Sequence, residues 1–561
     1  MTNDFDTQIR FVAGAAWRLM EMQDKNPLSP SWGCFHYAYW RDKTSEFADA
    51  RFQEAGPALA LLSLPAFDAV RTEAGLPSPV VLRQAFSAAL ANWQAQQYPD
   101  GCFDEWYKGE RGFAATEFTM IAYGLAARFL GDAMAAADRA RLSETMARAG
   151  RWLARRHDRV KANHEAAAAA ALALAWEVTG NEEFRRAARD KLDDTLARQR
   201  PEGWFPEVGG MDLGYCSVLL DYVMLHGLVT GDQTAVPAMR RLFAYMLPHL
   251  HPDGTITAES GLCLNPYVSR LGLGLLSAHD DDAAALVTTF RSSSPGIAGL
   301  RPTLADDLRL CRWSYLPLTT ALLAERFRGI GEGPEAFAAR LPQGWTHRAE
   351  SAVAACHQGR LHVYFAPAGG GVVRIYDGRA LLLEDDGLHM DDGTAKWASL
   401  GYDPDRPVEP VVGGFGMASA LGPASFFYPS FLSRLVLRVG CIVPQLSYLL
   451  RAAIDFYRLR ARTAVNQSAA PMAKGKSPYG YRRDVVVMDG TVRIRDRLEC
   501  RGGSFDTARV VATARRRGEP LAVAMPAGSW PALEIEKTVG PGGEVEVAAR
   551  TDGLAPPQSS R

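Results

Sequence analysis

Residues Ala162–Val178 read ANHEAAAAAALALAWEV, and this stretch predicts a long helix. Alanine and leucine are strong helix formers, and asparagine is a favoured residue at the N-terminal cap. Apolar residues also recur at intervals of three and four positions in Phe118–Leu130, Val218–Leu228 and Ala238–Leu247. This spacing places the apolar side chains on one face of a helix. Residues 1 to about 330 are therefore expected to be helical.

A loop signal recurs through this helical half. Proline, glycine and aromatic residues cluster at Trp32–Trp40, Pro99–Tyr107, Pro201–Val208 and Pro252–Glu259, and the last two clusters begin about 50 residues apart. A repeat of about 50 residues is the length of a helix pair with its connections. Six or so such pairs would close into an α/α toroid, and the alternative is an open α-solenoid. Loops rich in aromatic and acidic residues favour the toroid, because they would gather at one mouth and form a cleft.

The second half of the chain has the sequence pattern of β-strands and turns. Short β-branched runs occur at His362–Phe365, Val372–Tyr376 and Val485–Met488, and Asp-Gly pairs begin at Asp377 and Asp489. Such runs and turns are typical of β-hairpins. The predicted α+β division is residues 1–330 for the toroid, 331–349 for a linker, 350–540 for a β-sandwich-like domain and 541–561 for a poorly ordered tail.

Charge and cysteine usage exclude several classes of protein. The chain has 561 residues, with 62 lysines and arginines against 63 aspartates and glutamates. The resulting net charge of -1 excludes a strongly basic nucleic-acid binder. No two of the eight cysteines form a Cys-x-x-Cys pair, which argues against a local zinc knuckle and favours a reducing compartment.

The sequence predicts a cytoplasmic protein without a membrane span. Two aspartates stand within the first six residues, where a signal peptide would carry lysine or arginine. Ala166–Trp176 is too short to cross a membrane. Arg434 and Arg438 interrupt the other apolar stretch, Phe426–Leu450.

Asn163 and His164 form the first candidate site, at the start of the alanine-rich helix. Their simplest role is to cap that helix. A helix N-terminus also favours anions, so the amide and the imidazole could bind and neutralise a substrate carboxylate if they faced the cleft.

Tyr215 is the second candidate. It follows Gly209 and Gly210, which permit a tight turn and close backbone approach, and it comes just before the helix Val218–Leu228. A tyrosine at this place could donate or accept a proton if neighbouring cations lowered its pKa. The alternative is a ring packed between helices with its hydroxyl group bonded to the backbone.

The third candidate is a sugar-binding surface made by the mouth loops. Sugars stack their apolar faces on aromatic rings, and their hydroxyl groups bond to carboxylates. The set comprises Asp104, Glu105, Trp106, Tyr107, Arg111 and Glu117, with Trp204, Glu207, Asp212 and Glu259 from later loops. The alternative is a solvated loop that its own aromatic residues anchor. Paired carboxylates are also typical of glycoside hydrolases.

Two further clusters have less specific patterns. Asp49–Glu54 (DARFQE) could form an ion network between toroid helices or help to bind an anionic ligand. Glu384–Asp386 and His389–Asp392 could hold a metal, but a turn of solvated acids is the interpretation that we favour. We therefore predict no cofactor, with a structural divalent metal as the alternative.

Several fragments, in this order, resemble the heparinase II/III-like polysaccharide lyase group, above all its largely uncharacterised relatives from bacterial polysaccharide gene clusters. They are GCFHYAYW, DARFQE, PDGCFDEWY, ATEF, ANHEAAAAAALA, GWFPEVGGMDLGY and HPDGT, within about residues 20–270. The resemblance implies an α/α toroid followed by an antiparallel β-sandwich, and β-elimination on uronic-acid polysaccharides. It also implies that Asn163 and His164 face the uronate carboxylate and that Tyr215 is the acid and base.

The leading hypothesis is therefore a lyase that acts on an acidic glycan. Asn163 and His164 would neutralise the uronate carboxylate and so acidify the C5 proton. Tyr215 or His164 would remove that proton, and Tyr215 would protonate the 4-O leaving group.

Two alternatives stay open. One is a hydrolase that uses Glu105, Glu207 or Asp212 as acid and base. The other is a non-catalytic glycan-binding protein of polysaccharide biosynthesis. All three hypotheses share a glycan partner.

Overall fold

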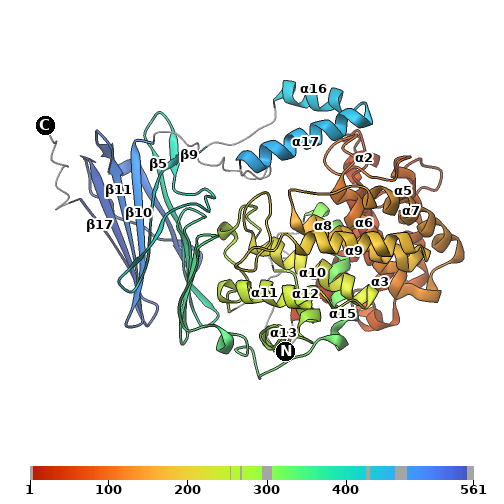
Figure 1. Ribbon diagram of the computed structural model, residues 1–561, viewed down its shortest axis with the longest axis horizontal. Coiled ribbons are helices and arrows are strands. Elements are labelled where there is room, and N and C mark those ends of the chain that lie inside the picture. Colours follow the sequence, from red (N-terminus) through yellow and green to blue (C-terminus); the bar gives the residue numbers. More distant parts are fainter. Residues whose placement is uncertain are drawn as a thin grey trace.

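The computed structural model of the protein describes residues 4–252, 254–265, 268–292, 306–424, 430–461 and 477–551. Helices make up the N-terminal domain and strands dominate the C-terminal one, and the two lie side by side in Figure 1.

Six helices form a closed inner ring within the described residues. They are α3 (Ala55–Leu62), α6 (Phe113–Leu130), α8 (Ala162–Thr179), α10 (Leu213–Thr230), α12 (Leu271–Leu276) and α15 (Tyr315–Leu322). Each packs on the next, and α15 packs back on α3. The helix α8 is buried continuously from Ala162 to Ala175. A helix that neighbours cover on every side must be apolar all round, which explains its run of alanines.

An outer layer of amphipathic helices surrounds this ring. It comprises α1 (Asp4–Met22), α5 (Pro79–Gln96), α7 (Ala136–Ala154), α9 (Glu182–Leu196), α11 (Val236–Met246) and α13 (Asp281–Ser292). Each outer helix packs on an inner one; α9, for example, buries Phe184, Ala188 and Leu192 at four-residue intervals. Three short helices complete the domain: α2 (Tyr37–Trp40), α4 (Asp68–Glu73) and α14 (Asp307–Trp313). The predicted α/α toroid is confirmed, and the ring is not an open solenoid.

By length and composition, α10 is the one helix of the described residues that could cross a membrane. Within the structure, however, 72% of it is buried in the centre of the toroid.

Two antiparallel sheets form the C-terminal domain. The first has the order β1-β2-β3-β4-β5-β13-β14, with β6 paired to β5 and β9 paired to β6, and the second has the order β17-β16-β11-β10-β8-β7. The strands of the first are β1 (Gly344–Arg348), β2 (Val353–Gln358), β3 (Leu361–Ala366), β4 (Val372–Asp377), β5 (Ala380–Asp391), β6 (Lys396–Ala398), β9 (Gly422–Pro423), β13 (Val510–Arg516) and β14 (Glu519–Pro520). Those of the second are β7 (Val408–Val411), β8 (Gly414–Ala420), β10 (Tyr479–Met488), β11 (Thr491–Cys500), β16 (Ala532–Val539) and β17 (Val545–Arg550), and a small pair is formed by β12 (Phe505–Asp506) and β15 (Ser529–Trp530).

The chain differs from the predicted division at three places. The first strand begins at Gly344, inside the predicted linker 331–349. β17 lies within the predicted tail 541–561, because its residues pair with β16; residues 552–561 lie outside the described part of the chain. Two helices, α16 (Phe431–Gly440) and α17 (Pro444–Ala461), stand between β9 and β10 in the sequence and lie over the toroid (Figure 1).

Buried histidines and tyrosines join the first sheet to the toroid. Tyr364 donates its hydroxyl group to the carbonyl of Leu250 (3.0 Å), and His357 bonds to the carbonyl of Pro248 through Nε2 (3.0 Å). Burial lowers the pKa of His357 to about 4, so its ring is neutral at pH 7 and Nε2–H donates this bond. The interface therefore fixes the two domains through directed polar contacts as well as apolar packing.

The centre of the β domain holds a fully buried ion cluster. Arg483 Nε lies 2.6 Å from Asp496 Oδ1, Arg483 Nη2 lies 3.0 Å from Asp385 Oδ1, and Lys537 Nζ lies 2.7 Å from Asp496 Oδ2. Asp385 therefore faces the core from strand β5 and is not part of a solvated turn. Asp392, at the end of the same acidic stretch, does accept turn hydrogen bonds.

We predict that Lys537→Met lowers the free energy of unfolding by about 3–5 kcal/mol, because it leaves Asp385 and Asp496 underpaired in the core. Urea denaturation measures this loss. The matched control is Arg495→Gln on β11, whose charge is half-exposed beside Glu534 and should cost less than about 1 kcal/mol. Equal losses for the two variants would contradict a special role for the buried cluster.

Candidate functional site

The loops that precede the inner helices meet at one end of the toroid. Ala162 N–H donates to the carbonyl of Pro206 (3.1 Å), and Leu262 N–H donates to the carbonyl of Met211 (3.0 Å). The loop before α3 is joined to the loop before α6 in the same way, because Ala50 N–H donates to the carbonyl of Asp104 (2.9 Å). Each of these bonds links one helix pair to the next, so the predicted clustering of the loops at one mouth is found.

Asn163 lies on the first turn of α8, and its side chain is fully buried. Its backbone N–H donates to Glu207 Oε1 (2.8 Å). The side-chain amide lies close enough to favour the charged form of Glu207, but neither of its polar atoms makes a well-formed hydrogen bond with any described residue. The amide does not cap α8 either, because Lys161 occupies the cap position. A buried polar group that lacks a well-formed hydrogen bond costs about 1–3 kcal/mol.

His164 is the next residue and lies among carboxyl groups. Its Nδ1 is 3.2 Å from Glu117 Oε1 and 3.4 Å from Asp158 Oδ2. The ring packs at right angles to Phe118, with the ring centroids 5.4 Å apart. These contacts hold the Nδ1 side of the imidazole in place and so fix the orientation of the ring.

The nearest acids are held in their neutral form. Burial raises the pKa of Glu117 well above its ordinary value, and the negative charges of Asp158 and Glu165 raise it further. Burial also raises the pKa of Glu207 to about 8. Glu207 is therefore protonated at neutral pH and can act as a hydrogen-bond donor beside Asn163, and burial disfavours the charged form of Glu117 beside His164.

Tyr215 lies on the first turn of α10, the neighbour of α8 in the ring, and is half-buried. Asp212 caps this helix and accepts from the N–H groups of Tyr215 (2.9 Å) and Cys263 (3.0 Å). Asp212 is thus a structural cap, although burial raises its pKa to about 7. Because α8 and α10 begin at the same mouth, Tyr215 belongs to the same end of the toroid as Asn163 and His164.

The DARFQE stretch forms an ion network. Arg51 Nε lies 2.5 Å from Glu54 Oε1, and the guanidinium group of Arg51 stacks on Phe118 at 4.3 Å. Arg312, from α14, reaches Glu105 at 2.9 Å and also contacts Asp49. This network joins the last helices of the ring to the first loops and leads, through Phe118, to His164.

The Asp104–Tyr107 loop contains a buried aspartate that organises its backbone and an aromatic side chain that is exposed to solvent. Asp104 accepts from the backbone N–H groups of Gly109 and Arg111 (2.7 and 2.8 Å) and so organises the loop. Trp106 is 54% exposed, with Arg312 over its ring at 5.4 Å, and Tyr107 is half-buried. Trp106 is therefore the aromatic side chain of this loop that is most open to a ligand.

Three predicted binding residues are engaged elsewhere. Arg111 pairs with Asp100 (2.8 Å). Trp204 is buried and donates to Glu350 (3.1 Å), and Glu259 pairs with Arg374 of strand β4 (3.3 Å). The last two lie at the contact between the domains and are not brought to Asn163.

A second acidic cluster lies behind the first turn of α8. Glu165 contacts Lys191 Nζ (2.9 Å) and His157 Nδ1 (2.7 Å). Glu165, His157 and Asp194 are close enough to one another to hold a metal ion. The ammonium group of Lys191 lies within 3.2 Å of His157 as well, so a cation already neutralises this cluster.

Sequence reasoning did not select Asp158, Lys191 or Arg312. Asp158 lies five residues before Asn163, so its proximity offered a signal. Lys191 and Arg312 come from helices whose sequences carry no motif, and only the packing of the ring brings them to the mouth.

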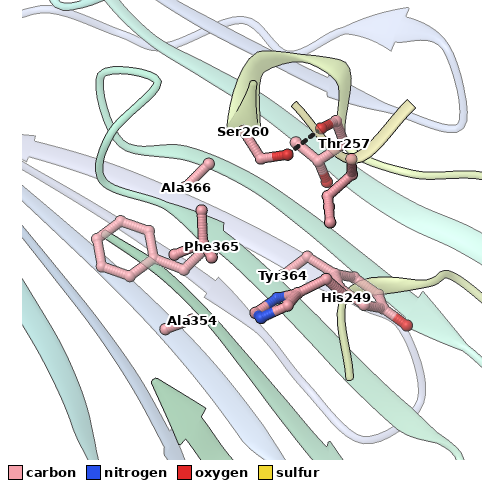
Figure 2. Close-up of a pocket in the computed structure, with 9 residues that line it drawn as sticks. His249, Thr257, Ser260, Ala354, Tyr364, Phe365 and Ala366 are labelled. Carbon is pink, nitrogen blue, oxygen red and sulfur yellow. Dashed lines mark hydrogen bonds between the residues drawn. The ribbon is translucent and has the colours of Figure 1, made fainter. Parts of the chain in front are cut away.

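A small pocket lies at the contact between the domains, and Leu213, the first residue of α10, forms part of its wall. Figure 2 shows His249, Thr257 and Ser260 on its toroid side and Ala354, Tyr364 and neighbouring residues of β2 and β3 on the other. Ser260 is turned to the carbonyl of Thr257 (2.6 Å). Its walls are mostly apolar, so we assign it to domain packing and not to catalysis.

No model of a known protein family matches the sequence, and no curated protein matches it. Among solved structures, the chain is similar to a variant of the chondroitin AC lyase of Streptomyces coelicolor A3, with a TM-score of 0.50 and 10% identity over 89% of this chain and 67% of that one. The same lyase in complex with chondroitin sulphate gives a TM-score of 0.49 and 12% identity over the same shares. A family 76 glycoside hydrolase from a bovine Bacteroides thetaiotaomicron strain gives 0.33 and 11% over 56% of this chain and 77% of that one. At these identities the first similarity concerns the fold alone, and the resemblance to the heparinase II/III-like group stays a prediction.

The neutral state of Glu207 predicts a pH-dependent effect of Glu207→Gln. Between the ordinary pKa of 4.5 and the folded value of about 8, the native wild type holds one proton more than the unfolded chain, so its free energy of unfolding falls as pH rises. Glutamine does not titrate. The stability of Glu207→Gln relative to wild type should therefore increase with pH over this window, by up to about 1.4 kcal/mol per pH unit, and level off above it.

Urea denaturation at a series of pH values measures this difference. The control is Glu332→Gln, which removes an exposed carboxyl group far from the mouth and should leave a constant difference. A difference between Glu207→Gln and wild type that does not change with pH would mean that Glu207 is ionised in the native protein.

Proposed function

We propose that the protein is a carbohydrate-active enzyme, specifically a lyase that cleaves uronic-acid-containing glycans by β-elimination at the mouth of the toroid. The observation that carries this proposal is the Asn163 amide, which is fully buried without a well-formed hydrogen bond to any described residue. Its neighbour in sequence is an imidazole, and a tyrosine stands on the adjacent inner helix.

A uronate carboxylate would complete this group of residues. Asn163 Nδ2 supplies a donor, and the protonated Glu207 beside it supplies a second. Neutralising the carboxylate acidifies the proton on C5, because the negative charge that develops on removal of that proton is then stabilised. Preorganised donors in a buried site are worth about 10²–10³ in rate each.

His164 and Tyr215 would then carry the proton steps. His164 lies with Nδ1 between Glu117 (3.2 Å) and Asp158 (3.4 Å), and the negative charge of Asp158 would support a positive charge on the ring when it accepts a proton. Tyr215 would return a proton to the leaving 4-O atom, so the glycosidic C–O bond breaks as the C4–C5 double bond forms. The product is an unsaturated sugar and a new reducing end, and no water is consumed.

The fold and the exposed aromatic side chain agree with this proposal. Trp106 stands 54% exposed on the mouth with a cation over its ring, which suits the stacking of a sugar face. The solved structure with a TM-score of 0.50 is that of a chondroitin AC lyase, so a toroid of this kind supports lyase chemistry in at least one other protein.

We predict that Asn163→Ala, His164→Ala and Tyr215→Phe each lower kcat/KM on an acidic polysaccharide by about 100-fold or more. The assay is the ultraviolet absorbance of the C4–C5 double bond, with mass spectrometry of the products from a panel of uronic-acid polysaccharides. Thermal melting checks that each variant folds.

The matched control is Asn181→Ala. Asn181 lies beyond the other end of α8, where its side chain accepts from Glu183 N–H (3.0 Å). This variant should lose a cap worth about 1 kcal/mol of stability and keep full activity. New reducing ends without absorbance would overturn the lyase in favour of a hydrolase, and a glycan-dependent rise in melting temperature without any product would favour a binding protein.

A further inference from the structure

The helices α16 and α17 form an arm, residues 430–461, that extends from the β domain over the toroid (Figure 1). α17 is attached along one rim of the mouth. Arg451 pairs with the buried Glu110 (2.8 Å), and the Tyr448 hydroxyl group bonds to Asp100 and to the indole N–H of Trp152 (3.0 Å each). In α16, by contrast, no residue is buried.

The arm carries an unusual concentration of exposed apolar side chains. More than half of the large hydrophobic residues that are exposed in the described part of the chain lie in it. Phe431 is 82% exposed, Ile442 is 75% exposed and Leu449 is 67% exposed. Single exposed apolar residues are normal on a soluble protein, but a contiguous patch marks an interaction site.

The two sides of α16 have different chemistry. Leu432, Val436 and Val439 follow one another at intervals of three and four residues and form an apolar stripe. Arg434 and Arg438 are four residues apart and share the other side. Arg438 pairs with Glu46 of the toroid (3.5 Å). Arg438 nevertheless stays 71% exposed and Arg434 is exposed as well, so both arginines flank the apolar stripe at the surface of the arm.

The sequence around the arm is strongly basic. Residues 430–461 contain five arginines and one acidic residue, Asp455, although the whole chain has a net charge of -1. Asp455 is itself paired with Arg451 (3.4 Å). The sequence of the arm thus combines an excess of positive charge with exposed apolar side chains.

We propose that the arm docks on the surface of an anionic lipid membrane, with α16 lying in the plane of the interface. A helix with an apolar stripe and arginines on its polar side binds in this way, since the stripe enters the acyl boundary while the arginines contact lipid phosphates. This inference does not rest on the proposed lyase activity.

A second copy of the chain fits the same surface less well. A twofold interface would set the patch against itself and bring the exposed Arg434 close to its own counterpart, and α16 carries no acid to neutralise it. A soluble acidic glycan would use the arginines and leave the apolar stripe in water.

The test is co-sedimentation of the full chain with vesicles. Wild type should sediment with vesicles of mixed phosphatidylcholine and phosphatidylglycerol, and at least about tenfold less with pure phosphatidylcholine. The double variant Val436→Glu/Val439→Glu should lose about tenfold or more of the binding, because two charges enter the stripe. Both residues are more than half exposed, so the melting temperature should not change.

The control is Val80→Glu, which adds a charge at a similarly exposed valine on α5, away from the arm, and should bind as wild type does. Two results would overturn the proposal. One is sedimentation that the double variant does not reduce. The other is a wild-type dimer in light scattering that the double variant converts to a monomer, which would assign the stripe to an interface between copies.

Discussion

Closure of the inner ring is the constraint on which the rest of the structure depends. Because α15 packs back on α3, the six inner helices must run side by side, and the loops before them converge at one mouth. The positive ends of the helix dipoles converge with them. Acids stand at these ends, with Glu165 in the first turn of α8 and Asp212 at the cap of α10. The helix dipoles favour negative charge at the mouth, whereas burial disfavours it and raises the pKa of Glu207 and Asp212.

The protonation of the buried acids decides which ligand the mouth accepts. If Glu117 and Glu207 were ionised, they would repel a uronate. Burial instead favours the neutral form of both, and the negative charges of Asp158 and Glu165 disfavour ionisation of Glu117 in particular. Lys191 neutralises Glu165 on the far side of the helix turn. Buried neutral donors, together with the amide of Asn163, would complement an incoming negative charge. Cations that are already held in ion pairs within the protein would complement it less well.

Local signals were enough to predict the toroid, its mouth and the alanine-rich helix, because propensity and periodicity depend on neighbouring residues only. The start of that helix was predicted less well, since Lys161 and not Asn163 occupies the cap position. The same signals could not place single side chains. Trp204 and Glu259 stand in mouth loops by sequence, but the β domain covers them, and that contact depends on a sheet formed some hundred residues later. α16 and α17 were not predicted. The arginines in the apolar stretch Phe426–Leu450 argue against a membrane span, and Arg434 and Arg438 also make α16 amphipathic.

The arm also connects the apolar stripe of α16 to the mouth loop that carries Trp106. Arg451 holds α17 to Glu110, and Glu110 in turn accepts the backbone N–H groups of Glu105 (3.1 Å) and Trp106 (2.7 Å). The exposed tryptophan of the mouth and the apolar stripe of α16 are thus joined through one buried carboxyl group and two helices. A displacement of the arm would change the pairing of Glu110 and with it the loop that carries Trp106. Glu110 is therefore the described side chain through which α17 contacts the loop that carries Trp106.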